Sequence, residues 1–178
     1  AVRVPAAFGG VVGTKPTYGL VSRCGLSAYA NSLEQVGPIA PTVEGAAELL
    51  EVSAGPDEHD ATTRDATEHG TDYGFTAAAD GNVEGLSIGI PTELVEGADE
   101  EVVGTFYEAI GDLEAQGASS HEVDLPSVEH AVEAYYVIAM SEASSNLARF
   151  DGVRYGTSGG YEGNWNDSFA KSREEGFG

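Results

Sequence analysis

Apolar residues recur at helical spacing just after Pro41. Counted from Val43, they fall at i, i+3, i+4, i+7 and i+11, and the last of them is Ala54. This spacing places them on one face of a helix, and Thr42 is a suitable N-capping residue. Gly55-Pro56 follows directly, and such a pair ends a helix. The sequence therefore predicts a helix from Thr42 to Ala54 with one buried face.

A strand, a helix and a second strand are expected further along the chain. Leu86–Ile90 is a short apolar run before Pro91 and predicts a buried strand. Asp99 can cap a following helix, and Gly117 marks its end. Residues 118–123 alternate loosely in polarity and predict the second strand. Because a crossover helix joins parallel strands, this unit indicates a mostly parallel sheet with helices on it. The apolar face expected for the helix consists of Val102, Val103, Phe106, Ile110 and Leu113.

The rest of the chain divides into a long helix, a short helix and loops. The long helix is expected from Ser127 through Ala148, and the short one over residues 166–175. Residues 1–41 are rich in Gly and Pro and predict small strands joined by tight loops. Residues 57–80 are polar and indicate a long surface loop. The positions expected to be buried in the long helix are Val128, Val132, Tyr135, Ile138, Ala139 and Ala143.

The charge of the chain excludes one class of function. The 178 residues include 8 Lys and Arg against 30 Asp and Glu, a formal charge of −22. Proteins bind nucleic acid mainly through Lys and Arg that neutralise phosphates, so direct nucleic-acid binding by this chain is not expected. Scarce lysine with abundant Asp, Glu, Ala and Gly is typical of proteins from salt-loving cells. Molar salt in such cells screens the repulsion between the acidic side chains.

Other sequence features indicate a cytoplasmic protein without a metal site. No apolar run approaches the roughly 18–20 residues that span a bilayer, and no secretory leader is visible. The lone Cys24 cannot form an internal disulfide. The histidines are scattered in polar surroundings without the spacing of metal ligands, so no metal site is expected. They are His59, His69, His121 and His130.

Three stretches of sequence resemble a known family. They are Ala1–Phe8 with Gly13–Gly19, Asn31–Pro38, and Ser141–Gly156 with Glu175–Gly178. The first two resemble the amidase signature family, and the third is similar to the A subunits of its aminoacyl-tRNA amidotransferases. The resemblance implies the α/β amidase signature fold, a mixed β-sheet covered by helices. It extends over essentially all 178 residues, so residues 1–178 are expected to be part of a single amidase domain.

The resemblance also implies a Ser–cis-Ser–Lys catalytic triad. In the family, the lysine activates the nucleophilic serine through the bridging serine. Ala1 stands at the position of this nucleophile, and the other triad positions would precede it. Alanine has no group that can attack a carbonyl. We therefore expect these 178 residues to be an internal fragment of the subunit that hydrolyses glutamine, and we expect this fragment to be inactive by itself.

Two residues are candidates for contact with the substrate. By resemblance, Tyr135 matches a tyrosine that lines the glutamine pocket, and the alternative is that it only packs against its neighbours. For Tyr136, packing is the favoured role. Arg3 follows the nucleophile position and is expected to hold the active-site loop through carboxylate or carbonyl groups, with substrate contact as the alternative. Lys15 and Ser32 are expected to be structural, the serine as a turn hydroxyl.

A dense set of polar residues lies at helical and loop spacing near the third stretch. We expect a buried network of ion pairs and hydrogen bonds that positions the pocket wall. Direct participation in catalysis is the alternative. The set consists of Glu142, Asn146, Arg149, Asp151 and Arg154.

The resemblance implies partners as well as a reaction. The intact protein would hydrolyse glutamine and pass ammonia to the B subunit, in a complex with the B and C subunits. The B subunit would hold the misacylated tRNA, Glu-tRNA(Gln) or Asp-tRNA(Asn), and use ATP and Mg²⁺ to convert it. No cofactor bound by this chain and no membrane contact are expected. Two alternatives stay open: a stand-alone small-molecule amidase, and a non-catalytic protein of amidase fold that only binds or scaffolds.

Overall fold

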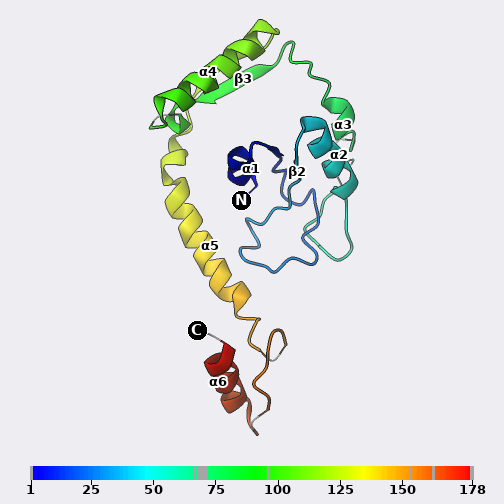
Figure 1. Cartoon of the computed structure of the whole chain (residues 1–178), viewed down its shortest axis with the longest axis vertical. Helices are drawn as coiled ribbons and strands as arrows, with labels where there is room; N and C mark the ends of the chain where they lie inside the picture. The colour runs from blue at the N-terminus through cyan, green and yellow to red at the C-terminus, as the bar shows by residue number, and fades with distance from the viewer. Residues whose placement is uncertain are drawn as a thin grey trace.

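The computed structural model describes residues 2–65, 67, 72–95, 97–152, 154–161 and 163–176. Its elements form three parts (Figure 1). Short elements up to residue 79 form the first part, and a strand–helix–strand unit over residues 87–123 forms the second. A long helix, α5 (Ala131–Leu147), runs from that unit past the first part, and α6 (Trp165–Gly176) lies beyond its C-terminal end (Figure 1).

The N-terminal residues begin with a helix that the sequence pattern does not predict. α1 (Arg3–Gly9) ends at Gly10, whose positive φ of 64° suits the left-handed C-cap. The expectation of strands and loops is therefore wrong for this segment. Ala6, Ala7 and Phe8 sustain a helix, and Pro5 is tolerated because it lies in the first turn.

A small antiparallel sheet and a helix follow. β1 (Val12–Gly13) pairs with β2 (Ile39–Ala40), and a Cβ on Gly13 would lie 2.6 Å from Cβ of Ala6 in α1. Only glycine therefore allows this close packing of α1 on β1. α2 (Val43–Ser53) confirms the first predicted helix, and the Thr42 hydroxyl accepts a 3.1 Å hydrogen bond from Gly45 N–H as the expected cap.

The predicted strand–helix–strand unit is confirmed. β3 (Ser87–Pro91) and β4 (Ser119–Val123) are parallel, and α4 (Glu100–Ala115) connects them. A short 3-10 helix, η2 (Thr92–Leu94), follows β3. Asp99 occupies the N-cap position of α4, but its side chain makes no capping hydrogen bond, so that detail of the prediction is wrong.

The expected buried face of α4 is only partly buried. Val103, Ile110 and Leu113 are half-buried, whereas Val102 and Phe106 are exposed. The prediction is wrong for the last two residues, because β4 is the main element that packs against α4 in the described part of the chain.

The long C-terminal helix begins later than predicted. A 3-10 helix, η3 (Pro126–His130), precedes α5 and carries the half-buried Val128. Ala139 and Ala143 are buried as expected, whereas Val132, Tyr135 and Ile138 are exposed, which corrects the prediction for these three. Helical periodicity identifies an apolar face without identifying what covers it. The last predicted helix is confirmed as α6.

Residues 57–80 are only in part the predicted surface loop. Asp60 is 7% exposed and anchors the loop to the first part of the molecule, and α3 (Phe75–Ala78) adds one helical turn. The polar composition of the segment favours a surface position, but a polar side chain can be buried when its hydrogen bonds are satisfied.

The described core is made mostly of small side chains. Its apolar members are Ala6, Val21, Ala30, Ala40, Ala46, Leu50, Ile90, Ala139 and Ala143. No large side chain in the described ranges is fully buried. None of the described helices is long and apolar enough to cross a membrane.

Candidate functional site

A cavity of about 520 Å³ lies where α1, the loop over residues 29–35 and α5 meet. It adjoins Val2, the residue after the nucleophile position implied by the family resemblance. Ala1 itself lies outside the described residues. The lining consists of Val2, Arg3, Val4, Lys15, Tyr29, Ala30, Leu33, Glu34, Gln35 and Tyr135.

One wall of the cavity is a turn closed by its own hydrogen bonds. Glu34 accepts hydrogen bonds from the N–H groups of Tyr29 and Ala30, the second at 3.1 Å. The carbonyl of Ala30 accepts from Leu33 N–H and Glu34 N–H, both at 2.9 Å. The carboxylate is thus engaged with the backbone, and the side chains of Tyr29 and Leu33 stand at the rim.

Tyr135 forms the opposite wall. It lies on α5, and its ring meets that of Tyr136 edge to face at 5.6 Å between centroids. Tyr136 is not among the cavity-lining residues. In the described part of the chain, the Tyr135 hydroxyl has no hydrogen-bond partner. That hydroxyl is therefore available to a molecule in the cavity.

Two cations stand at the same cavity. Lys15 is exposed, and its Nζ donates to the carbonyl of Pro16 at 3.0 Å. Arg3 is exposed on α1 and makes no hydrogen bond or ion pair within the described ranges, so the loop contacts predicted for it are not seen there. In a chain of net charge −22, two cations at one cavity favour an anionic group on the ligand.

The cavity wall is fastened to α5 by side chains from distant parts of the sequence. Ser32 donates to Glu142 from its N–H at 2.9 Å and also from its hydroxyl. Asn31 Nδ2 donates to Asn146 Oδ1 at 3.1 Å, and Asn146 Nδ2 donates to the carbonyl of Tyr29 at 3.1 Å. The hydrogen bonds from Ser32 hold the pKa of the Glu142 carboxyl below its ordinary value of 4.5. Ser32 is thus more than the turn hydroxyl that its local sequence predicts.

The other members of the predicted polar set are divided between two places. Arg149 donates from Nε to the Asn146 carbonyl and from Nη2 to its Oδ1, both at 3.0 Å. Arg154 Nη2 lies 3.6 Å from Asp151 Oδ2, beyond the end of α5. Arg149 and Arg154 are exposed, so the prediction of a single buried network of all five residues is wrong.

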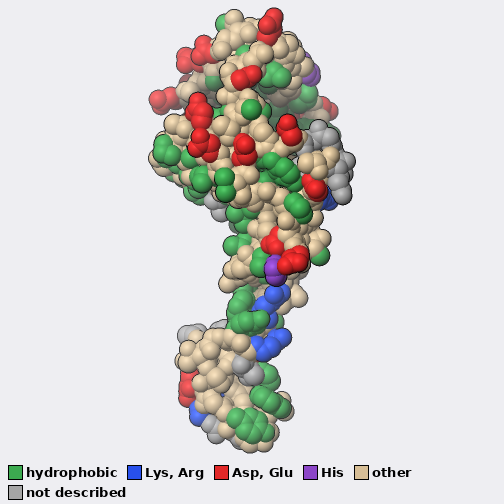
Figure 2. All heavy atoms as spheres, turned by 90° about the vertical axis from the view of Figure 1, so that its right-hand side faces the viewer, with side chains coloured by type: hydrophobic (Ala, Val, Ile, Leu, Met, Phe, Trp, Pro, Cys, Tyr) green, Lys and Arg blue, Asp and Glu red, His purple; other side chains and the backbone are tan. Residues whose placement is uncertain are grey.

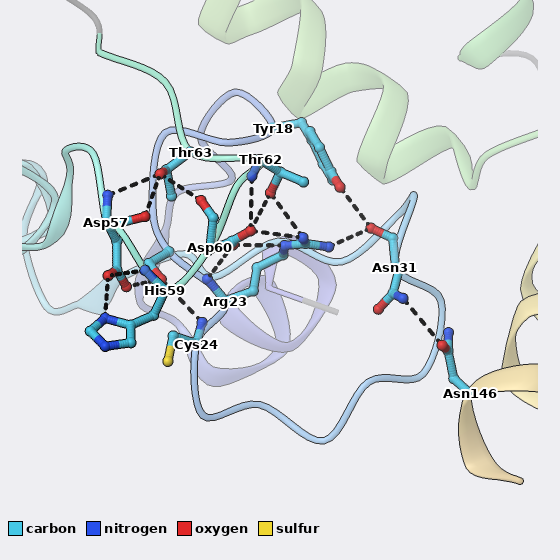
Figure 3. Close-up of polar contacts among 11 residues, drawn as sticks. Tyr18, Arg23, Cys24, Asn31, Asp57, His59, Asp60, Thr62, Thr63 and Asn146 are labelled. Carbon is cyan, nitrogen blue, oxygen red and sulfur yellow. Dashed lines mark hydrogen bonds and ion pairs between the residues drawn. The ribbon is translucent and has the colours of Figure 1, made fainter. Parts of the chain in front are cut away.

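A second polar cluster has no counterpart among the sequence-based predictions. Arg23 and Asp60 form an ion pair at 3.1 Å with side chains only 15% and 8% exposed (Figure 3). Hydrogen bonds from Arg23, and then from Thr62, hold the pKa of the Asp60 carboxyl far below its ordinary value of 3.8. Two sequence features could have indicated this cluster. Arg23 lies between Gly19 and Gly25, and a run of polar residues, Asp60 to Arg64, follows the helix stop at Gly55-Pro56.

No metal site is found in the described ranges, where no group of three or more His, Cys, Asp or Glu side chains could hold an ion. Of the four histidines, His69 lies outside the described residues. His59 lies beside Asp57, and His121 lies beside Ser87 across the β3–β4 pair.

Comparison with known proteins identifies the family of the chain. The amidase family profile matches residues 1–178. The chain belongs to the amidase family. The A subunit of a glutamyl-tRNA(Gln) amidotransferase from Haloarcula marismortui is 78% identical over all 178 residues. The corresponding protein from Methanosarcina mazei is 52% identical over 179 aligned residues, which cover 100% of this chain.

Solved structures of amidase-family proteins share the fold of the chain. A crystal structure of the glutamyl-tRNA(Gln) amidotransferase A subunit from Thermotoga maritima superposes with a TM-score of 0.75 and 46% identity, over 82% of this chain and 31% of that one. A peptide amidase from Stenotrophomonas maltophilia gives 0.69 and 29% identity, over 86% and 31%. The chain spans about two-fifths of the H. marismortui relative (41%) and about a third of the M. mazei one (36%).

Proposed function

We propose that this amidase-family chain forms the wall of the glutamine-binding cleft in the A subunit of a glutamine-dependent aminoacyl-tRNA amidotransferase. The observation that carries the proposal is the 78% identity to such a protein over every residue of the chain. The whole protein would hydrolyse glutamine to glutamate and ammonia. The ammonia would convert Glu-tRNA(Gln) to Gln-tRNA(Gln), or Asp-tRNA(Asn) to Asn-tRNA(Asn).

The described cavity supports a small polar substrate that carries a carboxylate. Arg3 and Lys15 supply positive charge at one side, and Tyr135 supplies a hydroxyl donor at the other. Glutamine has an α-carboxylate for the cations and a side-chain amide that would face the start of the chain, where Val2 lines the cavity. The nucleophile, the bridging serine and the lysine would come from the segment that ends at the position of Ala1.

The partners follow from the same proposal. The B and C subunits would complete the complex, and the B subunit would hold the misacylated tRNA together with ATP and Mg²⁺. This chain would bind no cofactor. Its charge of −22 supports a role for the partner, rather than this chain, in contacting RNA. The complex would work in the cytoplasm of a salt-loving cell.

Glutaminase assays of the full-length protein test the proposal. The full-length protein with Ala1→Ser, assembled with its partners, should release ammonia from glutamine. The same protein with alanine at this position should be slower by a factor of about 10³ or more, because no nucleophile is present. Equal rates for the two proteins would overturn the assignment of position 1, and the 178-residue chain alone should be inactive.

A second candidate is a stand-alone amidase acting on small amides. The similarity to a peptide amidase, with a TM-score of 0.69, favours it. Co-purification separates the two: an amidotransferase chain should be recovered with the B and C subunits, whereas a stand-alone amidase should be recovered alone and should hydrolyse simple amides better than glutamine. A non-catalytic scaffold would bind partners yet stay inactive with serine at position 1.

A further inference from the structure

A buried aspartate organises the chain behind the cavity wall. Asp60 accepts three hydrogen bonds from Arg23: from its N–H at 2.9 Å, Nε at 3.1 Å and Nη2 at 3.1 Å (Figure 3). It accepts two more from Thr62, from the N–H at 3.0 Å and the hydroxyl at 2.7 Å. The charge of Asp60 is thus fully engaged, and the plane of the Arg23 guanidinium is fixed.

The fixed guanidinium reaches the loop that forms the cavity wall. Arg23 Nη1 donates to the backbone carbonyl of Asn31 at 2.7 Å, and the Tyr18 hydroxyl donates to the same oxygen at 2.9 Å. The Tyr18 ring also lies under the guanidinium, with its centroid 5.3 Å from Cζ. The Asn31 carbonyl therefore accepts hydrogen bonds from two side chains, and one of them, Arg23, is fixed by its ion pair with the buried Asp60.

The side chain of Asn31 carries this constraint to α5. It donates to Asn146, which is itself 7% exposed and donates to the carbonyl of Tyr29. Tyr29 lines the cavity across from Tyr135, a residue of the same helix as Asn146. A continuous set of hydrogen bonds thus runs from Asp60 through Arg23 and Asn31 to both walls of the cavity.

We propose that Arg23 is a positioning residue for the glutamine cleft, acting through Asn31 and Asn146 on the spacing between Tyr29 and Tyr135. A lysine at this position cannot replace it. Its single ammonium lacks the planar fork that contacts both oxygens of Asp60, the hydroxyl of Thr62 and the Asn31 carbonyl at once. The inference rests on the proposed function for its kinetic readout.

The test compares Arg23→Lys with Arg173→Lys in the full-length Ala1→Ser protein, assembled with its partners. Arg173→Lys makes the same chemical change at an exposed residue of α6, a helix that lies beyond the C-terminal end of α5 and does not line the cavity (Figure 1). Arg23→Lys should raise the KM for glutamine about tenfold while kcat stays within about twofold, because a displaced wall weakens binding without removing a reacting group. Arg173→Lys should change neither constant.

Hydrogen exchange supplies a readout that does not depend on activity. In Arg23→Lys, the backbone amides of residues 29–34 should exchange at least about tenfold faster, while those of α2 should not change. A variant with lower thermal stability but unchanged KM and unchanged exchange in this loop would overturn the proposal. If the full-length Ala1→Ser protein lacks glutaminase activity, the proposed function fails, and the exchange result still decides the positioning role.

A milder variant covers the case in which Arg23→Lys does not fold. Tyr18→Phe removes one of the two donors to the Asn31 carbonyl and leaves the ion pair intact. It should raise the KM for glutamine by about twofold to fivefold and accelerate exchange in the same loop. Wild-type values for both quantities would contradict the inference.

Discussion

Ser32 and Glu142 are joined by two hydrogen bonds although 110 residues separate them in the chain. Both donors come from Ser32, its N–H and its hydroxyl, and both oxygens of the Glu142 carboxylate accept. The Glu142 carboxylate accepts two charge-assisted hydrogen bonds and so joins the turn that contains Ser32 to α5. This contact therefore holds the loop over residues 29–35 against α5.

Glu142→Gln should weaken this contact, because the amide keeps one acceptor oxygen and loses the charge. The KM for glutamine of the full-length Ala1→Ser protein should rise roughly threefold to tenfold. Glu133→Gln, an exposed change on the same helix, is the matched control and should leave it unchanged. Steady-state glutaminase kinetics check the prediction, and equal effects of the two variants would refute it.

In the full-length Ala1→Ser protein, Tyr135→Phe should raise the KM for glutamine about fivefold, since a hydrogen bond to the substrate on the order of 1 kcal/mol is lost. Tyr136→Phe is the control, because Tyr136 neighbours Tyr135 on α5 but does not line the cavity. Both variants keep the aromatic ring and hence its packing. If Tyr135→Phe leaves glutaminase kinetics unchanged, Tyr135 has no part in the pocket.

Asp60→Asn should reduce the loss of thermal stability that occurs as the pH falls into the acid range. A carboxyl whose pKa is lowered in the folded state stabilises the protein above its ordinary value of 3.8, and this contribution is lost as pH falls towards the lower folded pKa. Wild type should therefore lose thermal stability between about pH 4 and about pH 2, and the variant should lose less. At pH 7 the variant should be the less stable protein. Melting curves across this range check it, with the exposed Asp112→Asn as control.

Gly19→Ala should destabilise the fold more than Gly25→Ala. Both glycines have positive φ, 81° and 88°, so both substitutions are strained. A Cβ on Gly19 would also lie 2.3 Å from the carbonyl oxygen of Thr62, whereas one on Gly25 would meet nothing within 4 Å. We expect about 1 kcal/mol for Gly25→Ala and about 2 kcal/mol or more for Gly19→Ala. Equal losses in denaturant unfolding would contradict the predicted clash.

The melting temperature should rise between dilute and molar KCl. Acidic side chains gather on the face seen in Figure 2, and their repulsion is screened within about 3 Å at molar salt. Glu108 and Asp112 are exposed like charges four residues apart on α4. Replacing them with Gln and Asn should make the dependence on KCl shallower. A melting temperature that is independent of salt would remove the link to a salt-loving cell.

Patterns of neighbouring residues correctly predict α2 and β3. Thr42 and Gly55-Pro56 mark the ends of α2 within a few residues, and the apolar run of β3 is readable from its own sequence. α1 is missed because Pro5 and the surrounding glycines suggest loops, although a proline in the first turn does not oppose a helix. Burial on α5 is mispredicted because periodicity identifies an apolar face without identifying what covers it.

The site depends on contacts that no local pattern encodes. Tyr135 is found through family resemblance, and the structure places it at the cavity. Ser32–Glu142 and Arg23–Asp60 join residues 110 and 37 positions apart, so spacing along the chain carries no sign of them. Arg3 lies on α1 and is exposed, and a segment predicted to be loop gives no indication of this placement.

The bond between Asn31 and Asn146 spans 115 residues and has a consequence for synthesis. At about 5–20 residues per second, a ribosome needs roughly 6–23 seconds to advance from one asparagine to the other. During that interval the nascent turn has no helix to dock on, and its apolar rim is open to other chains. The cleft therefore stays open until α5 has been made, and a pause in translation before α5 would prolong its exposure.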